Sequence, residues 1–120
     1  MAHILVIDDE LQIRLMLRKL LEPEGYTITE APDGIEGIKR YHENPADLII
    51  TDLIMPDKEG LETIMELKKE NPAVKIIAMS GGGKNKPEGY LHLAKQFGAM
   101  ETLEKPIRKE ELLKAIKNLV

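Results

Sequence analysis

The chain has 120 residues, of which 42% are hydrophobic and 32% are charged, and this length predicts one domain over residues 1–120. It has no cysteine, which excludes a disulfide scaffold, a thiolate zinc site and cysteine catalysis. Its net charge of −4, with one Phe, three Tyr and no Trp, argues against direct binding of nucleic acid.

Short apolar runs alternate with amphipathic stretches along the whole chain. The apolar or β-branched runs predict strands at residues 3–7, 27–30, 47–51, 74–79 and 100–103. The amphipathic stretches predict helices at residues 10–22, from Asp33 onward, and at 58–70, 86–97 and 108–119. The first helix is expected to place four leucines near one face: Leu11, Leu15, Leu17 and Leu21. Five strands separated by five helices predict an α/β protein, with a five-stranded parallel sheet and helices on both of its faces.

Polar side chains stand where four of these strands end. The first strand is followed by Asp8-Asp9-Glu10, the third by Asp52, the fourth by Ser80, and the fifth by Lys105-Pro106. Each has an ordinary explanation when taken alone, such as a helix cap, a turn or a surface lysine. In open α/β sheets, however, ligands bind outside the carboxyl ends of the strands. We therefore expect these residues to converge at one edge of the sheet.

Three carboxylates in one place repel one another unless a cation neutralises them. Asp8, Asp9 and Asp52 offer only oxygen, which favours Mg²⁺ or Mn²⁺ over zinc or copper. A carboxylate beside such a cation, a hydroxyl and a lysine predicts phosphoryl transfer to the carboxylate itself. Ser80 and Lys105 are the residue types that would stabilise the charge on the transferring group.

Four segments of the chain, in their order and spacing, resemble the response-regulator receiver domain of two-component signalling. They are ILVIDDE (4–10), DLIITDLIMPDKEG (47–60), AMSGG (78–82) and FGAMETLEKPI (97–107). The D-x-x-M-P-x-x-x-G pattern that begins at Asp52 is the most specific of these, and the resemblance covers essentially the whole chain. It implies the flavodoxin-like doubly wound fold of the chemotaxis regulators, with strand order 2-1-3-4-5.

The resemblance also implies a role for each carboxylate. Asp52 is expected to be phosphorylated. Asp9 is expected to bind Mg²⁺ directly, and Asp8 is expected to bind it through water. Asp52 and the backbone carbonyl of Ile54 are the further expected ligands of the cation.

The switch residues implied by the resemblance lie on the fourth and fifth strands. The Ser80 hydroxyl is expected to turn toward the phosphoryl group, Lys105 is expected to contact that group, and Lys105-Pro106 is expected to be a cis peptide. Thr102 stands where the family usually has Tyr or Phe, so we expect its response to differ from that of an aromatic switch. The glycine-rich residues 81–89 are expected to form a mobile lid over the phosphoryl group.

The leading hypothesis is a signalling switch that catalyses only its own phosphorylation and dephosphorylation. A histidine kinase or phosphotransfer protein would phosphorylate Asp52, and a downstream effector or output domain would recognise the fourth helix, fifth strand and fifth helix. One alternative is a magnesium-dependent phosphatase with an aspartyl intermediate, but such enzymes have D-x-D where this chain has the adjacent pair Asp8-Asp9. The other is a receiver-like interaction module that is never phosphorylated, which would normally lack part of this residue set.

The remaining expectations concern location and assembly. No apolar run approaches the roughly 20 residues that cross a bilayer, and no secretory signal opens the chain. We therefore expect a cytoplasmic protein without membrane contact. The resemblance implies a monomer or a weak homodimer.

Overall fold

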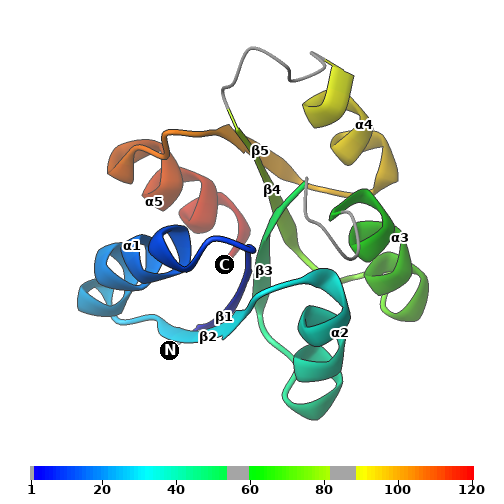
Figure 1. Cartoon of the computed structure of the whole chain (residues 1–120), viewed down its shortest axis with the longest axis horizontal. Coiled ribbons are helices and arrows are strands. Elements are labelled where there is room, and N and C mark those ends of the chain that lie inside the picture. Colours follow the sequence, from blue (N-terminus) through cyan, green and yellow to red (C-terminus); the bar gives the residue numbers. More distant parts are fainter. Residues whose placement is uncertain (1, 54–59, 82–88) are drawn as a thin grey trace.

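The computed structural model describes residues 2–53, 60–81 and 89–120 of the chain. In these residues five strands form one sheet: β1 (His3–Ile7), β2 (Thr27–Ala31), β3 (Leu48–Asp52), β4 (Ile76–Ser80) and β5 (Glu101–Glu104). Every neighbouring pair is parallel, and the spatial order is β2-β1-β3-β4-β5 (Figure 1). The predicted α/β class and strand order are both confirmed.

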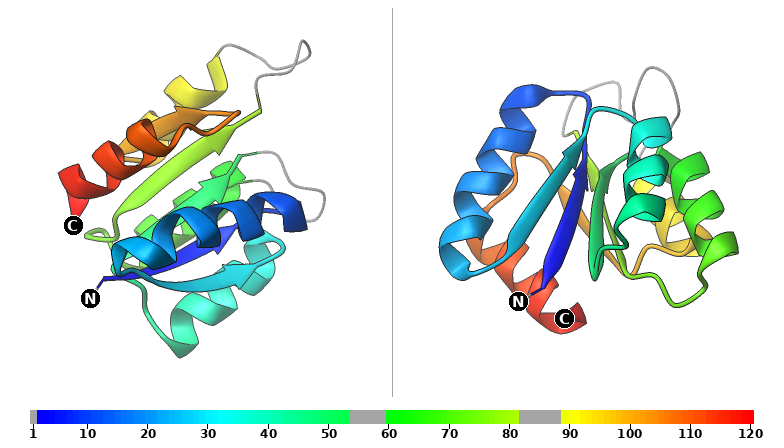
Figure 2. Two further views of the ribbon diagram at one scale, coloured as in Figure 1. Left: turned by 90° about the vertical axis from the view of Figure 1, so that its left-hand side faces the viewer. Right: turned by 90° about the horizontal axis from the view of Figure 1, so that it is seen from below.

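Helices cover both faces of this sheet (Figures 1 and 2). One face carries α1 (Leu11–Leu21) and α5 (Lys109–Leu119), and the other carries α2 (Gly34–Glu43), α3 (Gly60–Glu70) and α4 (Gly89–Phe97). A 3₁₀ turn, η1 (Glu22–Glu24), joins α1 to β2. This arrangement is what right-handed crossovers between parallel strands produce. In the described part of the chain, no helix has both the length and the apolar character needed to span a bilayer.

The strands supply two hydrophobic cores because successive side chains point to opposite faces of the sheet. In β1, Leu5 and Ile7 pack with residues of α2, α3 and α4, whereas Ile4 and Val6 pack with residues of α1 and α5. Every residue of β3 and of β4 is buried. These strands are therefore continuous apolar runs in the sequence, as is typical of parallel strands that are covered on both faces.

The buried face of α1 differs from the predicted one. Leu17 and Leu21 are fully buried, but Leu11 is 56% exposed and Leu15 is 42% exposed. The prediction that the four leucines share one face is wrong, because the two-residue step from Leu15 to Leu17 turns an α-helix by about 200°. The exposed pair lies at the start of the helix, next to the acidic segment that follows β1.

Four strands run one residue further than predicted, toward the edge where the polar residues lie. β2 ends at Ala31, β3 at Asp52, β4 at Ser80 and β5 at Glu104. In register, Asp52 is paired with Met79, so the hydrogen-bonded ladder continues into the site. At its other end, β4 begins at Ile76 rather than at residue 74. Asp52 and Ser80 are thus the last residues of their strands, and Asp8 and Lys105 each come directly after a strand.

The predicted helix starts agree with the structure where they can be compared. The Asp33 side chain accepts a hydrogen bond from the Glu36 amide at 2.8 Å, which caps the N-terminus of α2 as predicted. Helices α1 and α5 each begin one residue after the predicted start. The other two predicted starts, at residues 58 and 86, lie outside the described residues.

Candidate functional site

The predicted site residues meet at the carboxyl edge of the sheet. Asp8 follows β1, Asp52 ends β3, Ser80 ends β4, and Lys105 follows β5. The neighbouring positions of β1, β3 and β4 place the first three on adjacent strand ends. Lys105 is attached to the same edge because its backbone N–H donates to the Ser80 carbonyl at 2.8 Å.

The Lys105 ammonium lies among three carboxylates. Its Nζ atom is 2.8 Å from Asp8 Oδ2, 3.5 Å from Asp52 Oδ1 and 3.7 Å from Glu10 Oε1. The lysine side chain is only 12% exposed. Burial alone would lower the pKa of Lys105, but its hydrogen bond to Asp8 and the charge of Asp52 outweigh burial, and the pKa is raised. Lys105 is therefore a permanent positive charge at this edge.

Asp8 is fully buried, and its carboxylate is held on both sides. Oδ2 accepts the hydrogen bond from Lys105, and Oδ1 accepts one from the backbone N–H of Glu10 at 2.8 Å. The Asp8 N–H donates to the Ala31 carbonyl at 3.1 Å, which joins the end of β1 to the end of β2. Asp8 is thus fixed by three elements of the fold.

A group of oxygen ligands lies directly after β1. The side chains of Asp8, Asp9 and Glu10 each offer a carboxylate oxygen, and these atoms all lie within 4.8 Å of one another. Asp8 is buried, while Asp9 and Glu10 are exposed. Because they offer only oxygen, these donors fit a hard divalent cation such as Mg²⁺ or Mn²⁺. The remaining expected ligand, the Ile54 carbonyl, lies outside the described residues.

Asp52 is a buried carboxyl group in an unfavourable environment. It is only 5% exposed, and burial raises its pKa to about 6, with a further contribution from the charges of Asp8 and Asp9. Lys105 opposes this rise but does not cancel it. Any additional positive charge beside Asp52 would consequently stabilise its ionised form.

The Ser80 hydroxyl is a buried polar group at the end of β4. The residue is fully buried, and within the described part of the chain its Oγ atom has no hydrogen-bond partner. A buried hydroxyl without a partner costs about 1–3 kcal/mol. This hydroxyl is free to bond to a group that enters the site.

The other predicted switch residue and the predicted cis bond also lie near this edge. Thr102 is half-buried in β5, where it is paired with Ala78 of β4. The peptide bond between Lys105 and Pro106 is cis. The region expected to form a lid, residues 81–89, falls mostly outside the described residues, which include only Gly81 and Gly89 of it.

Two supporting residues were not found by sequence reasoning. Arg14 of α1 donates from Nη1 to the Asp8 carbonyl at 2.6 Å, and its Nε donates to Glu30 of β2 at 3.1 Å. No local sequence pattern marks these residues, because α1 and β2 meet only in the folded chain. The one available signal was the position of Arg14, within two helical turns of the acidic segment.

Gly60 lies against the backbone of the strand that carries Asp52. A Cβ atom at this position would be 2.1 Å from the Asp52 carbonyl oxygen and 2.6 Å from the Leu53 Cα atom. The Gly60 N–H donates to the Leu53 carbonyl at 2.8 Å. The glycine eight residues after Asp52 therefore allows α3 to begin in contact with the end of β3.

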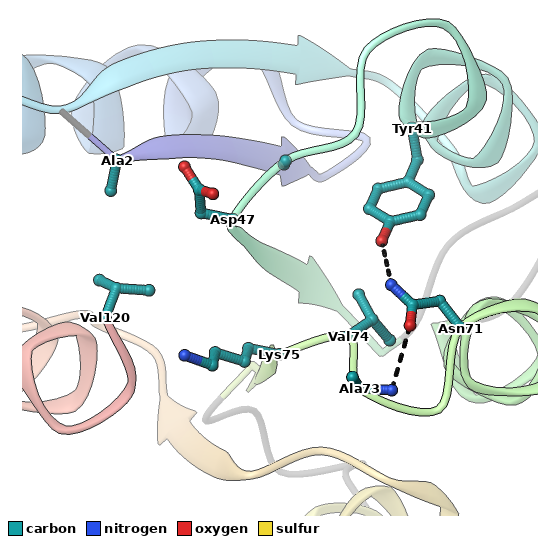
Figure 3. Close-up of a pocket in the computed structure, with 9 residues that line it drawn as sticks. Ala2, Tyr41, Asp47, Asn71, Ala73, Val74, Lys75 and Val120 are labelled. Carbon is teal, nitrogen blue, oxygen red and sulfur yellow. Dashed lines mark hydrogen bonds between the residues drawn. The ribbon is translucent and has the colours of Figure 1, made fainter.

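The opposite edge of the sheet has a pocket of about 350 Å³ that contains none of the predicted site residues (Figure 3). Its lining residues are Ala2, Tyr41, Ala46, Asp47, Asn71, Ala73, Val74, Lys75 and Val120. Polar groups in this lining bond to the protein itself. Asn71 Nδ2 donates to the Tyr41 hydroxyl at 2.9 Å, and Asp47 accepts from the His3 N–H at 2.8 Å. The first bond joins α2 to the residue after α3, and the second joins the start of β1 to the residue before β3, which accounts for these polar residues.

Replacing Gly60 by alanine tests its close approach to Asp52. Because the added Cβ would overlap backbone atoms, we expect Gly60→Ala to lower the free energy of unfolding by about 2–4 kcal/mol in denaturant titrations. Gly81→Ala is the matched control, since no atom of residues 2–53, 60–81 or 89–120 lies within 4 Å of a Cβ atom at that position. Equal effects of the two substitutions would contradict the proposed contact.

Asp52→Asn tests the raised pKa of the carboxyl group. The folded state binds a proton more tightly than the unfolded chain does, so ionisation of Asp52 costs stability above pH 6 and costs nothing below about pH 4. Without divalent cations, we expect Asp52→Asn to raise the free energy of unfolding by about 1–3 kcal/mol at pH 7. The gain should shrink as the pH falls from 6 to 4. Denaturant titrations across this range would measure it, and a difference that does not depend on pH would refute the assignment.

Comparison with known proteins identifies the family of this chain. The family model described as the response regulator receiver domain matches residues 4–117. The chemotaxis protein CheY of Bacillus subtilis is 31% identical over 118 residues, which cover 97% of this chain and 96% of that protein. The transcriptional regulatory protein ResD of the same organism is 36% identical over 121 residues, but these cover 99% of this chain and only 48% of ResD.

Solved structures with a closely similar fold come from the same family. A response regulator receiver domain protein of Clostridium thermocellum is 36% identical, with a TM-score of 0.90 over 99% of this chain and 94% of that one. The response regulator TrrA of Thermotoga maritima is 34% identical, with a TM-score of 0.88 over 100% of both chains. This chain belongs to the family of response regulator receiver domains, which are regulatory domains of two-component systems.

Proposed function

We propose that residues 1–120 act as one receiver domain, a switch that is turned on when Asp52 takes a phosphoryl group from a histidine kinase or phosphotransfer protein. One observation carries this proposal: Asp52 is buried at a strand end, with the Lys105 ammonium 3.5 Å from its Oδ1 atom. Ser80 ends the neighbouring strand, and its hydroxyl has no hydrogen-bond partner among the described residues. A nucleophilic carboxylate, a cation and a hydrogen-bond donor are the groups that phosphoryl transfer to aspartate requires.

The reaction follows from the roles of these groups. An Asp52 carboxylate oxygen attacks phosphorus as the P–N bond of a phosphohistidine breaks, and the bonding electron pair stays on the departing imidazole. The product is an acyl phosphate on Asp52. The Lys105 ammonium offsets the charge on the phosphoryl oxygens, and the Ser80 hydroxyl donates a hydrogen bond to one of them. Attack of water on phosphorus later restores the carboxylate and releases inorganic phosphate.

A divalent cation, Mg²⁺ or Mn²⁺, would supply the positive charge that the acidic residues need when the phosphoryl group is present. Asp9 is exposed and would bind the cation directly, together with Asp52. Both carboxylate oxygens of Asp8 already accept hydrogen bonds, which favours a contact through water. The similar protein TrrA has a structure in complex with Mg²⁺-BeF, which supports a cation at the corresponding site here.

The added charge would change the surface formed by α4, β5 and α5. Ser80 ends β4 and its carbonyl bonds to the Lys105 N–H, so a movement of Ser80 toward the phosphoryl group would shift the connection from β5 to α5. Thr102, which lacks an aromatic ring, would respond only by a small repacking. A downstream effector protein would bind this surface, or an output domain would, as the greater length of ResD suggests.

Intact-mass measurement after incubation with Mg²⁺ and a small acyl-phosphate donor tests the proposed function. We expect the wild-type protein to gain the mass of one phosphoryl group, because a reactive carboxylate lies beside Lys105. Asp52→Asn should abolish the gain. Asp47→Asn is the matched control, since Asp47 lies at the opposite edge of the sheet and the gain should persist.

Other outcomes would contradict the proposal. Release of phosphate from many unrelated phosphate monoesters would indicate a phosphatase instead. No mass gain with any acyl-phosphate donor or with a phosphorylated histidine protein would indicate an interaction module. A gain that persists in Asp52→Asn would show that another residue is the acceptor.

A further inference from the structure

A pair of arginines on α1 surrounds one glutamate of β2, close to the acidic segment. Glu30 accepts hydrogen bonds from Arg14 Nε at 3.1 Å and from Arg18 Nε at 2.8 Å. Arg18 also binds Glu22 at 2.7 Å through Nη1. The four charges therefore balance. Each arginine also donates to a backbone carbonyl, Arg18 to that of Ile28 at 3.4 Å, but of the two only Arg14 makes a contact with the acidic segment.

That contact is the hydrogen bond from Arg14 Nη1 to the Asp8 carbonyl, at 2.6 Å. This carbonyl belongs to the peptide group that joins Asp8 to Asp9. Its orientation sets the direction in which the Asp9 side chain leaves the backbone. The other polar groups of Asp8 are held by β2, by Glu10 and by Lys105, so Arg14 completes the support of this residue.

We propose that Arg14, itself held by Glu30, is a positioning residue that sets the affinity of the site for a divalent cation by fixing the peptide group between Asp8 and Asp9. This inference rests on the proposed cation site. Arg14 would not itself touch the cation. It acts by keeping Asp9 directed toward the place where the cation binds.

The geometry distinguishes Arg14 from a residue of an ordinary surface ion pair. Its side chain is 14% exposed, and its planar guanidinium bonds two different partners at once, which a lysine ammonium would do without a fixed orientation. Burial would raise the pKa of Glu30, but the hydrogen bonds from Arg18 and Arg14 outweigh burial, and the pKa is lowered. Glu30 is therefore ionised and anchors Arg14 firmly.

Pairing with Glu30 also offsets the charge of Arg14. A guanidinium bonded to the backbone beside a cation site would repel the cation if its charge were unbalanced. Glu30 neutralises that charge at 3.1 Å. The site thus gains the directional hydrogen bond of arginine without an uncompensated positive charge. Outer-shell hydrogen bonds of this kind commonly change metal affinity by about 10–100-fold when they are removed.

Binding of Mn²⁺ without any phosphoryl donor tests this inference, measured by calorimetry and by the paramagnetic resonance of free Mn²⁺. We expect Arg14→Met to weaken binding about tenfold. Arg18→Met is the matched control, because it removes an equal charge from the same glutamate and leaves the Asp8 carbonyl bonded. Its effect should be less than about twofold, since a charge further from the site is screened by salt. Loss of positive charge alone would tighten cation binding in both variants.

Several outcomes would overturn the inference. Equal effects of the two substitutions, or tighter binding by Arg14→Met, would show that Arg14 acts only through its charge or only on stability. If Arg14→Met fails to fold, as judged by circular dichroism, Arg14→Lys takes its place. It keeps the charge but loses the rigid planar guanidinium that holds Glu30 and the Asp8 carbonyl in one fixed geometry. Binding should therefore still weaken several-fold, about three- to tenfold, and unchanged affinity would refute the role.

Mn²⁺ binding by the wild-type protein and by Asp9→Asn distinguishes a failure of the cation site from a failure of the positioning role alone. If the wild type has no Mn²⁺ site that Asp9→Asn removes, the proposed cation site fails and the positioning role fails with it. If that site exists and Arg14→Met leaves its affinity unchanged, only the positioning role fails.

Discussion

The buried ion pair between Lys105 and Asp8 is the interaction on which the carboxyl edge of this sheet depends. Its 2.8 Å contact joins residues from the two ends of the chain, one after β1 and one after β5. Asp52 lies between them in the sheet and shares the same ammonium at 3.5 Å. Removal of one partner from a buried pair typically costs about 3–5 kcal/mol, because the remaining charge is left uncompensated. Without a bound cation, Lys105 is thus the main positive charge that offsets the carboxylates at this edge.

One lysine does not balance the acidic groups completely, and this imbalance is the basis of the proposed switch. The pKa of Asp52 stays raised, at about 6, despite the nearby ammonium. The hydroxyl of Ser80 is buried without a partner in the described part of the chain. A cation beside Asp52 and a phosphoryl group facing Ser80 would satisfy both groups. Before phosphorylation, the described residues thus leave the Asp52 charge only partly offset and the Ser80 hydroxyl without a hydrogen bond, and the proposed phosphorylation would supply both interactions.

The sequence predicted the fold because its signals are local. Alternating apolar and amphipathic stretches gave the five strands and five helices, and the rule for strand ends brought Asp8, Asp52, Ser80 and Lys105 together before any coordinates were considered. The order of the strands came from family resemblance rather than from the pattern. Errors at the ends of the strands were of one or two residues, because the hydrogen-bonded ladder continues into polar residues such as Asp52.

What the sequence did not reveal depends on contacts between distant elements. The leucines of α1 were assigned to one face because they are all apolar, but only Leu17 and Leu21 face the sheet. The bond from Arg14 to the Asp8 carbonyl joins a helix to a loop through a side chain that no motif marks. Such a contact depends on how closely α1 packs against β2, which three-dimensional packing decides.

Asp52 is a buried carboxyl group whose negative charge is only partly offset by Lys105, and a bound divalent cation would offset the rest. The most direct measurement is a titration of the Asp52 side-chain carboxyl carbon by nuclear magnetic resonance, with and without saturating Mg²⁺. We expect a pKa of about 6 without the cation and a clear fall in that pKa when Mg²⁺ is added. An ordinary aspartate pKa in metal-free protein, or a raised pKa that Mg²⁺ does not change, would contradict this expectation.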